Sequence, residues 1–336
     1  MKILKNHSLK NYNTFGINVN AKLFTKVHSI DDFKKISKTK EFRDNKILLL
    51  GSGSNILFIK DFDGLVVKDE IKGIEIVTEN KDYIWIKAGG GEDWNDFVNY
   101  CVDNNYAGIE NLSLIPGTVG AAPIQNIGAY GVELKDIFEQ LEAINLKNTS
   151  ISIFKKKDCK FGYRDSVFKN KLKGKYFISS VTLRLNKKPV FKTSYGAIED
   201  TLKDLDLKKN IKNISSVVSK IRESKLPYPK EIANAGSFFK NPVVDEKKFN
   251  DLMKRYPSIP NFKTGKSIKV SAAWFIEKCG WKGKRIGNIG VHDKQALVLV
   301  NYGNAGGKEI KKLAEDIVES VKSKFGIILN LEVSIV

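Results

Sequence analysis

Residues 114–131 constrain the fold of this chain more than any other stretch, because they hold four glycines and two prolines but no charged residue. Glycine admits backbone conformations closed to other residues, and proline removes a backbone donor, so one long helix or strand cannot run through this segment. A surface loop is rarely so apolar, which favours a buried loop that lines a ligand. The small side chains of Ala121 and Ala122 suit a backbone close to a planar or diphosphate ligand. Gln125 and Asn126 offer amides to the edge of a heterocycle.

A second glycine-rich segment, Gly-Ser-Gly-Ser-Asn at 51–55, lies between apolar runs that predict strands at 46–50 and 55–60. The backbone N–H groups of such a tight turn can bind a phosphate, and its polar side chains add neutral donors. The segment does not match the dinucleotide fingerprint G-x-G-x-x-G, because Ile56 stands at the third glycine position and no helix follows. Taken alone, it can equally be a simple hairpin turn.

The rest of the pattern mixes strands and helices in an irregular order, which predicts an α+β fold and not a strictly alternating parallel sheet. An amphipathic helix is expected at 93–104, and the helix around 214–221 is expected to open another domain. Gly280 and Gly326 are expected to end two later helices. Further strands are expected at 65–68, 74–77, 83–87, 177–185 and, with Leu329, Leu331, Val333 and Ile335 on one face, at the C-terminus.

The charge of the chain is strongly positive: 57 Lys and Arg against 38 Asp and Glu give +19 over 336 residues. These basic residues are scattered, with a single triplet at 155–157 and no aromatic-interleaved stripe, which disfavours a nucleic-acid partner. A compositional bias of the source, or a positive field around a site for anionic small molecules, explains the excess equally well.

Cysteine, histidine and the apolar runs point to a reduced, soluble setting. The three cysteines, Cys101, Cys159 and Cys279, form no C-x-x-C pair, so neither a disulfide framework nor a zinc site is expected. The three histidines have no spacing typical of a metal site. The N-terminus shows no secretion signal, and the apolar runs are far shorter than the ~20 residues that cross a bilayer. We therefore expect a cytoplasmic protein with no membrane partner.

Six motifs follow one another along the chain and carry a specific resemblance. From about residue 8 to its end, the chain resembles the UDP-N-acetylenolpyruvoylglucosamine reductases, also called UDP-N-acetylmuramate dehydrogenases, of the peptidoglycan pathway. Thr-Ser-Tyr-Gly at 193–196 and the length resemble the longer subtype, in which a loop with a tyrosine covers the substrate. The motifs are Asn-Thr-Phe-Gly (13–16), Gly-Ser-Gly-Ser-Asn (51–55), the stretch 115–131, Phe-Gly-Tyr-Arg-Asp-Ser (161–166), Ala-Gly-Ser-Phe-Phe-Lys-Asn-Pro (235–242) and the terminal strand with Glu332.

The resemblance implies a fold and a cofactor. A two-lobed FAD-binding module of the vanillyl-alcohol-oxidase type is expected over 17–188, with its lobes meeting near residue 70. An α+β substrate-binding portion over 189–326 and a C-terminal strand over 327–336 that returns to the first lobe should follow. FAD should be noncovalent, since no His or Cys lies in the segments that would hold it. The residues implied for FAD are Gly51, Ser52, Gly53, Ser54, Asn55, Gly117, Gly120, Gln125 and Gly128.

The resemblance also implies a reaction: NADPH reduces FAD, and the enolpyruvyl ether of UDP-N-acetylglucosamine is then reduced to UDP-N-acetylmuramate. Arg164 and Glu332 match the family positions that meet the negative charge developing on the carboxylate, where a planar guanidinium can contact two oxygens at once. Ser237 matches the family's proton donor to C2. From the residues alone, the alternatives are an Arg164–Asp165 ion pair, a solvated Glu332, and a Ser237 bonded to backbone.

Four further positions match the family's substrate contacts, and among them Lys225 is expected to pair with the diphosphate and Tyr195 to cover the site. The other two are Asn241 and Gln295. The implied partners are small molecules. No metal is expected, and the enzyme is expected to be a monomer. Two alternatives remain open: another flavoprotein of the same FAD fold, such as a sugar or alcohol oxidase, and a basic nucleic-acid-binding protein.

Overall fold

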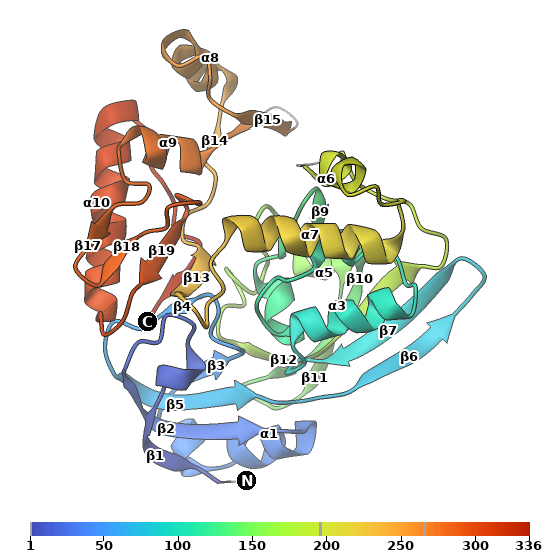
Figure 1. Ribbon diagram of the computed structural model, residues 1–336. Coiled ribbons are helices and arrows are strands. Elements are labelled where there is room, and N and C mark those ends of the chain that lie inside the picture. The colour runs from blue at the N-terminus through green and yellow to red at the C-terminus, as the bar shows by residue number, and fades with distance from the viewer. Residues whose placement is uncertain (1, 195–196, 265–266) are drawn as a thin grey trace. The chain divides into compact units, whose positions relative to one another are not determined.

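A computed structural model gives the fold of residues 2–194, 197–264 and 267–336 (Figure 1). The chain divides into two compact units, each assembled from three segments. The first unit comprises Met1–His7, Ala21–Ser52 and Asp63–Ser224, and the second comprises Ser8–Asn20, Gly53–Phe62 and Lys225–Val336. Over the described ranges, no helix is long and apolar enough to span a bilayer.

The first unit begins with a four-stranded sheet in the order β1-β2-β5-β3, in which β3 and β5 run parallel. Ser29 caps the first helix on this sheet by accepting a hydrogen bond from the Asp32 N–H, as an N-cap serine does. Phe33 from that helix stacks on Phe177 with ring centroids 4.5 Å apart, which ties this sheet to the next. The elements are β1 (Leu4–Ser8), β2 (Asn20–Val27), α1 (Ile30–Ser37), α2 (Lys40–Arg43), β3 (Lys46–Leu50) and β5 (Phe62–Asp69).

The second sheet of this unit is antiparallel and has the order β11-β10-β12-β7-β6. Short helices and turns join its strands. The strands are β6 (Ile74–Glu79), β7 (Tyr83–Gly89), β10 (Phe138–Asn145), β11 (Ile151–Lys155) and β12 (Tyr176–Asn186), and the connecting elements are α3 (Trp94–Asp103), η2 (Glu110–Leu112), η3 (Val119–Ile124), β8 (Gly128–Ala129), β9 (Val132–Glu133), α4 (Leu134–Ile137) and α5 (Lys156–Cys159).

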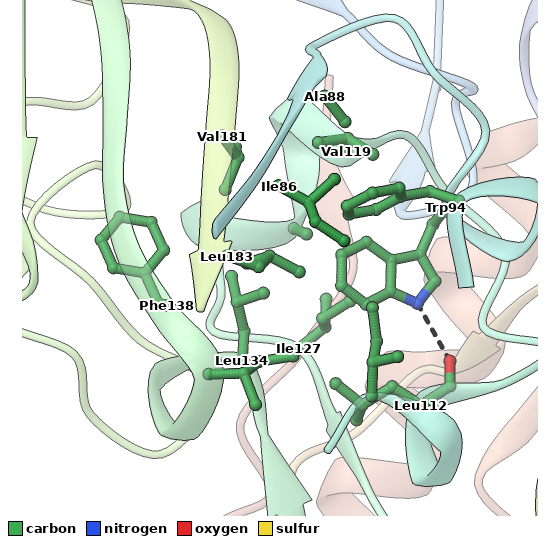
Figure 2. Close-up of a cluster of buried hydrophobic side chains, with 14 of the residues drawn as sticks. Ile86, Ala88, Trp94, Leu112, Val119, Ile127, Leu134, Phe138, Val181 and Leu183 are labelled. Atoms are coloured by element: carbon green, nitrogen blue, oxygen red, sulfur yellow. Dashed lines mark hydrogen bonds between the residues drawn. The ribbon is translucent and has the colours of Figure 1, made fainter. Parts of the chain in front are cut away.

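Helix α3 supplies the centre of the core beside this sheet (Figure 2). The Asp93 side chain caps it by accepting from the next two free backbone N–H groups, so the helix predicted at 93–104 is confirmed. Trp94 is 1% exposed, and its indole N–H donates to the Leu112 carbonyl at 2.9 Å, which satisfies the one polar atom of the ring. Cys101 is fully buried in this core, and burial raises the pKa of its thiol.

Helix α7 (Ile211–Lys225) confirms the helix expected around 214–221 but corrects its place in the chain. Up to Ser224 it closes the first unit; it does not open the second. The reason is its apolar face, which packs with α6 (Ile198–Asp204) into one buried cluster and against partly buried Tyr130 and Phe191 of the same unit. In Figure 1, α7 is the long gold helix.

The second unit is built on the sheet β13-β19-β18-β17, with α10 and α9 packed near it (Figure 1). Gly280 after α9 and Gly326 after α10 have φ of +77° and +63°, which confirms both predicted helix ends. The elements are η1 (Lys10–Tyr12), β13 (Ala233–Ser237), β14 (Val243–Val244), α8 (Glu246–Arg255), β15 (Asn261–Thr264), β16 (Ser267–Val270), α9 (Ala272–Lys278), β17 (Arg285–Ile286), β18 (Ile289–Val291), β19 (Val298–Asn301) and α10 (Gly307–Phe325).

The motif at 13–16 stabilises this unit from within. The buried Asn13 amide donates to the carbonyls of Leu9 and Ile17 and accepts from the Ile17 N–H, so one side chain fixes a whole turn. The Thr14 carbonyl accepts from the Asn234 N–H at 3.0 Å. The turn is therefore joined directly to the strand that ends at Ser237.

Residues 51–55 join two strands that do not pair with each other. Strand β3 pairs with β5, whereas β4 (Ile56–Leu57) pairs in parallel with β20 (Ser334–Ile335), so the hairpin interpretation is wrong. The C-terminal segment keeps the expected alternation, with Leu329 and Val333 buried, although only β20 is regular strand. The division into 17–188, 189–326 and 327–336 stays a prediction.

Candidate active site

A cavity that opens to solvent lies within the first unit. The end of β3, the end of β5, η3 and the start of β12 form its wall, and most of the wall is apolar. Its lining residues are Leu49, Leu50, Gly51, Asp69, Thr118, Gly120, Ala121, Ile124, Tyr176, Phe177 and Ile178. The two predicted glycine-rich segments therefore meet at one cavity.

Three glycines at this cavity have no room for a side chain, because neighbouring side-chain and main-chain atoms fill the place of a Cβ. A Cβ on Gly51 would lie 2.5 Å from Thr118 Oγ1, and one on Gly90 would lie 2.4 Å from both Asp69 Oδ2 and the Ile178 carbonyl. A Cβ on Gly120 would lie 3.0 Å from Gly90. Such distances exclude any larger residue unless neighbours move. Gly90 was missed at the sequence level, although the run of three glycines at 89–91, where β7 ends, was a visible signal.

Ser52 gives the cavity's first loop an unsatisfied donor. Its Oγ is buried, and within the described ranges no group forms a hydrogen bond with it. Buried hydroxyls are normally paired, so an orphan of this kind fits a site that a ligand completes. The orphan hydroxyl and the apolar wall together fit a site that a bound molecule completes.

Gly53 has a local structural role. Its φ is +70°, and a Cβ there would lie 2.1 Å from the Tyr12 carbonyl oxygen. The next residues of the loop are also in use, since the Asn55 amide donates to the Glu332 carbonyl at 3.3 Å. A contact between FAD and the backbone of residues 53–55 stays a prediction.

The second predicted loop is buried only in part, since Pro116, Ile124 and Gly131 are exposed, and its middle is the 3₁₀ helix η3. The Gly120 N–H donates to the Gly90 carbonyl at 2.8 Å, which fixes η3 at the cavity. Asn126 differs from expectation, because its amide is used inside the loop: it donates to the Gly162 carbonyl at 2.9 Å and accepts from the Lys135 N–H at 2.9 Å. Gln125 is partly buried, and its role toward FAD stays a prediction.

Arg164 is held in an uncommon conformation, with φ of +51°. Its Nη2 donates to the Gly128 carbonyl, and its guanidinium lies 5.5 Å from the centre of the Tyr163 ring. Both oxygens of the neighbouring Asp165 carboxylate accept from the Asn170 amide. Backbone strain of this kind is typical of functional positions.

Arg222 is a cation that the sequence analysis missed. It lies on α7, its Nε donates to the Leu114 carbonyl at 3.2 Å, and burial lowers the pKa of its guanidinium. The charge of Arg164 lowers that pKa further, so the two guanidinium groups lie close enough to interact. Their shared positive field suits an anionic substrate. In the sequence, Arg222 looks like one of many helix surface charges.

Ser237 and Glu332 lie on neighbouring segments of the second unit. The Glu332 N–H donates to the Phe238 carbonyl at 2.8 Å, and the Lys240 N–H donates to the Asn330 carbonyl at 2.9 Å. Phe238 and its neighbour Phe239 are 0% and 1% exposed, so an apolar wall lies directly beside Ser237. The structure thus brings two of the three predicted catalytic residues together; Arg164 belongs to the first unit.

Gln295 is joined to the same segment. Its Oε1 accepts from the Leu297 N–H at 3.4 Å, and the Leu297 carbonyl accepts from the Phe238 N–H at 2.7 Å. Asn241 follows two positions after Phe239, and its Oδ1 accepts from the Ala272 N–H at the start of α9. Lys225 ends α7 and is exposed. Tyr195 lies outside the described residues.

Comparison with known proteins decides the family. A UDP-N-acetylenolpyruvoylglucosamine reductase of Amoebophilus asiaticus is 49% identical over 338 residues, covering 100% of both chains. This chain belongs to the UDP-N-acetylenolpyruvoylglucosamine reductase family. The family member of Flavobacterium johnsoniae is 46% identical, again over 100% of both chains. Residues 21–152 match the FAD binding domain family, and residues 227–336 match the C-terminal domain of UDP-N-acetylenolpyruvoylglucosamine reductase.

A solved member of the family shows the same fold. The crystal structure of the reductase from Thermus caldophilus superimposes with a TM-score of 0.66 at 22% identity, over 99% of this chain and 98% of that one. The resemblance and the expected α+β fold with an FAD-binding module are therefore confirmed. The chain is an FAD-containing oxidoreductase.

Proposed function

We propose that this chain reduces the enolpyruvyl ether of UDP-N-acetylglucosamine to UDP-N-acetylmuramate, a peptidoglycan precursor, with NADPH as the reductant. The observation that carries this proposal is full-length identity of 49% to a relative named for that reduction. We expect the enzyme to act as a cytoplasmic monomer. The direct test is oxidation of NADPH by the purified protein, which should depend on the enolpyruvyl substrate.

When bound, FAD would supply a hydride carrier between the nicotinamide and the substrate. In the proposed site, the glycine cradle of Gly51, Gly90 and Gly120 brings main chain against the cofactor, and the orphan Ser52 hydroxyl donates to it. The other residues proposed to contact FAD are Gly53, Ser54, Asn55, Gly117, Gln125 and Gly128.

The chain's own residues are proposed to act on the substrate. Arg164 binds the carboxylate and stabilises the negative charge that develops there, with the nearby Arg222 adding to the positive field. Ser237 donates its proton to C2, and the buried Phe238 and Phe239 keep water from the hydroxyl. Glu332, held against Phe238 by its own backbone, is proposed to assist at the carboxylate end.

We predict that Gly51→Ala weakens FAD binding by about tenfold or more, which corresponds to ~1.4 kcal/mol. The added Cβ would meet Thr118 Oγ1 at 2.5 Å and displace that side chain into the cavity. The measurement is the flavin absorbance at about 450 nm per protein after dialysis. Gly306→Ala is the control, because its Cβ would meet nothing nearer than 3.5 Å. Full flavin content in Gly51→Ala would contradict the cradle.

We predict that Lys225→Ala raises KM for the substrate and for NADPH with little change in kcat. Lys225 is exposed at the end of α7, and a cation that only holds an anionic ligand contributes equally to ground state and transition state. Steady-state kinetics with each substrate varied in turn measures both constants. Lys220→Ala, earlier on the same helix, is the matched control. Unchanged KM values would remove Lys225 from the site.

A further inference from the structure

Asp69 is the single charged residue among the residues that line the cavity of the first unit. It ends strand β5 and is 6% exposed. A carboxyl group in such an apolar wall is costly in its charged form unless a partner compensates it. The proposed FAD site gives this residue no assigned task.

The two oxygens of Asp69 have different surroundings. Oδ1 accepts a hydrogen bond from the Ile71 N–H at 3.0 Å. Oδ2 occupies the place that a side chain on Gly90 would fill, 2.4 Å from the Cβ position. The glycine at 90 thus keeps room for the carboxyl group of Asp69, a residue that lines the cavity.

The lysines near Asp69 form their hydrogen bond and ion pairs with groups other than the Asp69 carboxyl group. Lys68 donates to the Asp69 main-chain carbonyl at 2.8 Å and pairs with Glu70 at 3.2 Å, and Lys72 pairs with Glu92 at 3.4 Å. From the other elements around the cavity, β3, η3 and β12, the lining residues contribute one titratable group, Tyr176.

We propose that Asp69 binds FAD as a neutral acid, donating its Oδ2 proton to an acceptor atom of the cofactor. The proposal rests on the FAD site proposed above and adds to it a residue whose charge controls affinity. FAD brings two negative charges in its diphosphate, so an ionised Asp69 in the same apolar cavity would repel it and could not donate. The neutral acid removes the repulsion and supplies a hydrogen bond.

The sign of the expected pH dependence follows from this assignment. Burial raises the pKa of Asp69 to about 7, although the Ile71 N–H and Lys68 oppose that rise. If FAD binds the neutral form, affinity is full below this pKa and falls about tenfold per pH unit above it. Between pH ~6 and ~8.5 the dissociation constant should therefore rise about 10- to 30-fold.

The experiment measures the dissociation constant of FAD by flavin fluorescence across this pH range, for the unaltered protein and two variants. Asp69→Asn keeps the shape and a donor but cannot ionise, so its affinity should be independent of pH and should exceed that of the unaltered protein at high pH. Asp63→Asn makes the same change at an exposed position of the same strand. It should retain the pH dependence.

Each outcome decides one claim. Affinity that is flat with pH in the unaltered protein, or that increases with pH, would overturn the proposal, and so would an Asp69→Asn variant that keeps the pH dependence. If Asp69→Asn fails to fold, the titration of the unaltered protein still decides. Absence of FAD binding at every pH would instead overturn the proposed function, so the two failures are distinguishable.

Discussion

Ser237→Ala should slow the oxidation of the reduced enzyme by the enolpyruvyl substrate by about 10²- to 10⁴-fold, the usual contribution of a general acid. Reduction by NADPH should proceed at a near-normal rate, since that half-reaction needs no proton from this hydroxyl. The change removes one oxygen beside two buried phenylalanines, so packing should hold. Stopped-flow absorbance at about 450 nm follows each half-reaction separately.

The control for Ser237 is Ser334→Ala, in the exposed position of β20 within the same unit. It should leave both half-reactions unchanged. Equal slowing of both halves in Ser237→Ala would indicate a binding or structural role. Normal reoxidation would remove Ser237 from the mechanism and make Glu332 or a bound water the proton donor.

Arg164→Lys should lower kcat for the overall reaction by about 10²- to 10³-fold, as removal of one preorganised charge-stabilising donor does. Lysine keeps the charge but loses the planar fork that can meet two carboxylate oxygens, and also the bond to the Gly128 carbonyl. Single-turnover reoxidation by the substrate should show the loss, whereas reduction by NADPH should not.

A matched Arg→Lys change is available at Arg184, an exposed residue of β12 in the same unit, whose guanidinium lies 4.9 Å from the centre of the Tyr83 ring. Arg184→Lys should leave kcat unchanged. If Arg164→Lys keeps kcat and raises only the substrate KM, Arg164 contributes uniform binding and not transition-state stabilisation.

Features fixed by short-range chemistry could be predicted from the sequence. Asp93 begins its helix and Gly326 ends another because a capping carboxylate and a left-handed glycine act on neighbouring residues. The burial of the middle of the loop at 114–131, at Thr118, Val119 and Gly120, agrees with its apolar composition. Each of these predictions needed only a local window of sequence.

Features that depend on distant segments could not be predicted in this way. Nothing near Ile56 indicates that its strand pairs with residues 334–335. Asp69 lies between Lys68 and Glu70, so it looks like a surface charge, and only the approach of Gly90 from another sheet shows that it is buried. Arg222 was missed, and the bonds of Asn126 were not foreseen, for the same reason, since their partners lie on other elements.

Strand β20 is synthesised long after β4, the strand with which it pairs, and this delay affects folding during synthesis. Strand β4 leaves the ribosome early, but its pairing partner is made only with the last residues, and Asn55 and Glu332 are separated by 277 positions. Closing so long a loop is slow, because ordering entropy is spent before the contact forms. Until residues 334–335 have been made, the far end of the 51–55 loop therefore lacks the strand that pairs with it.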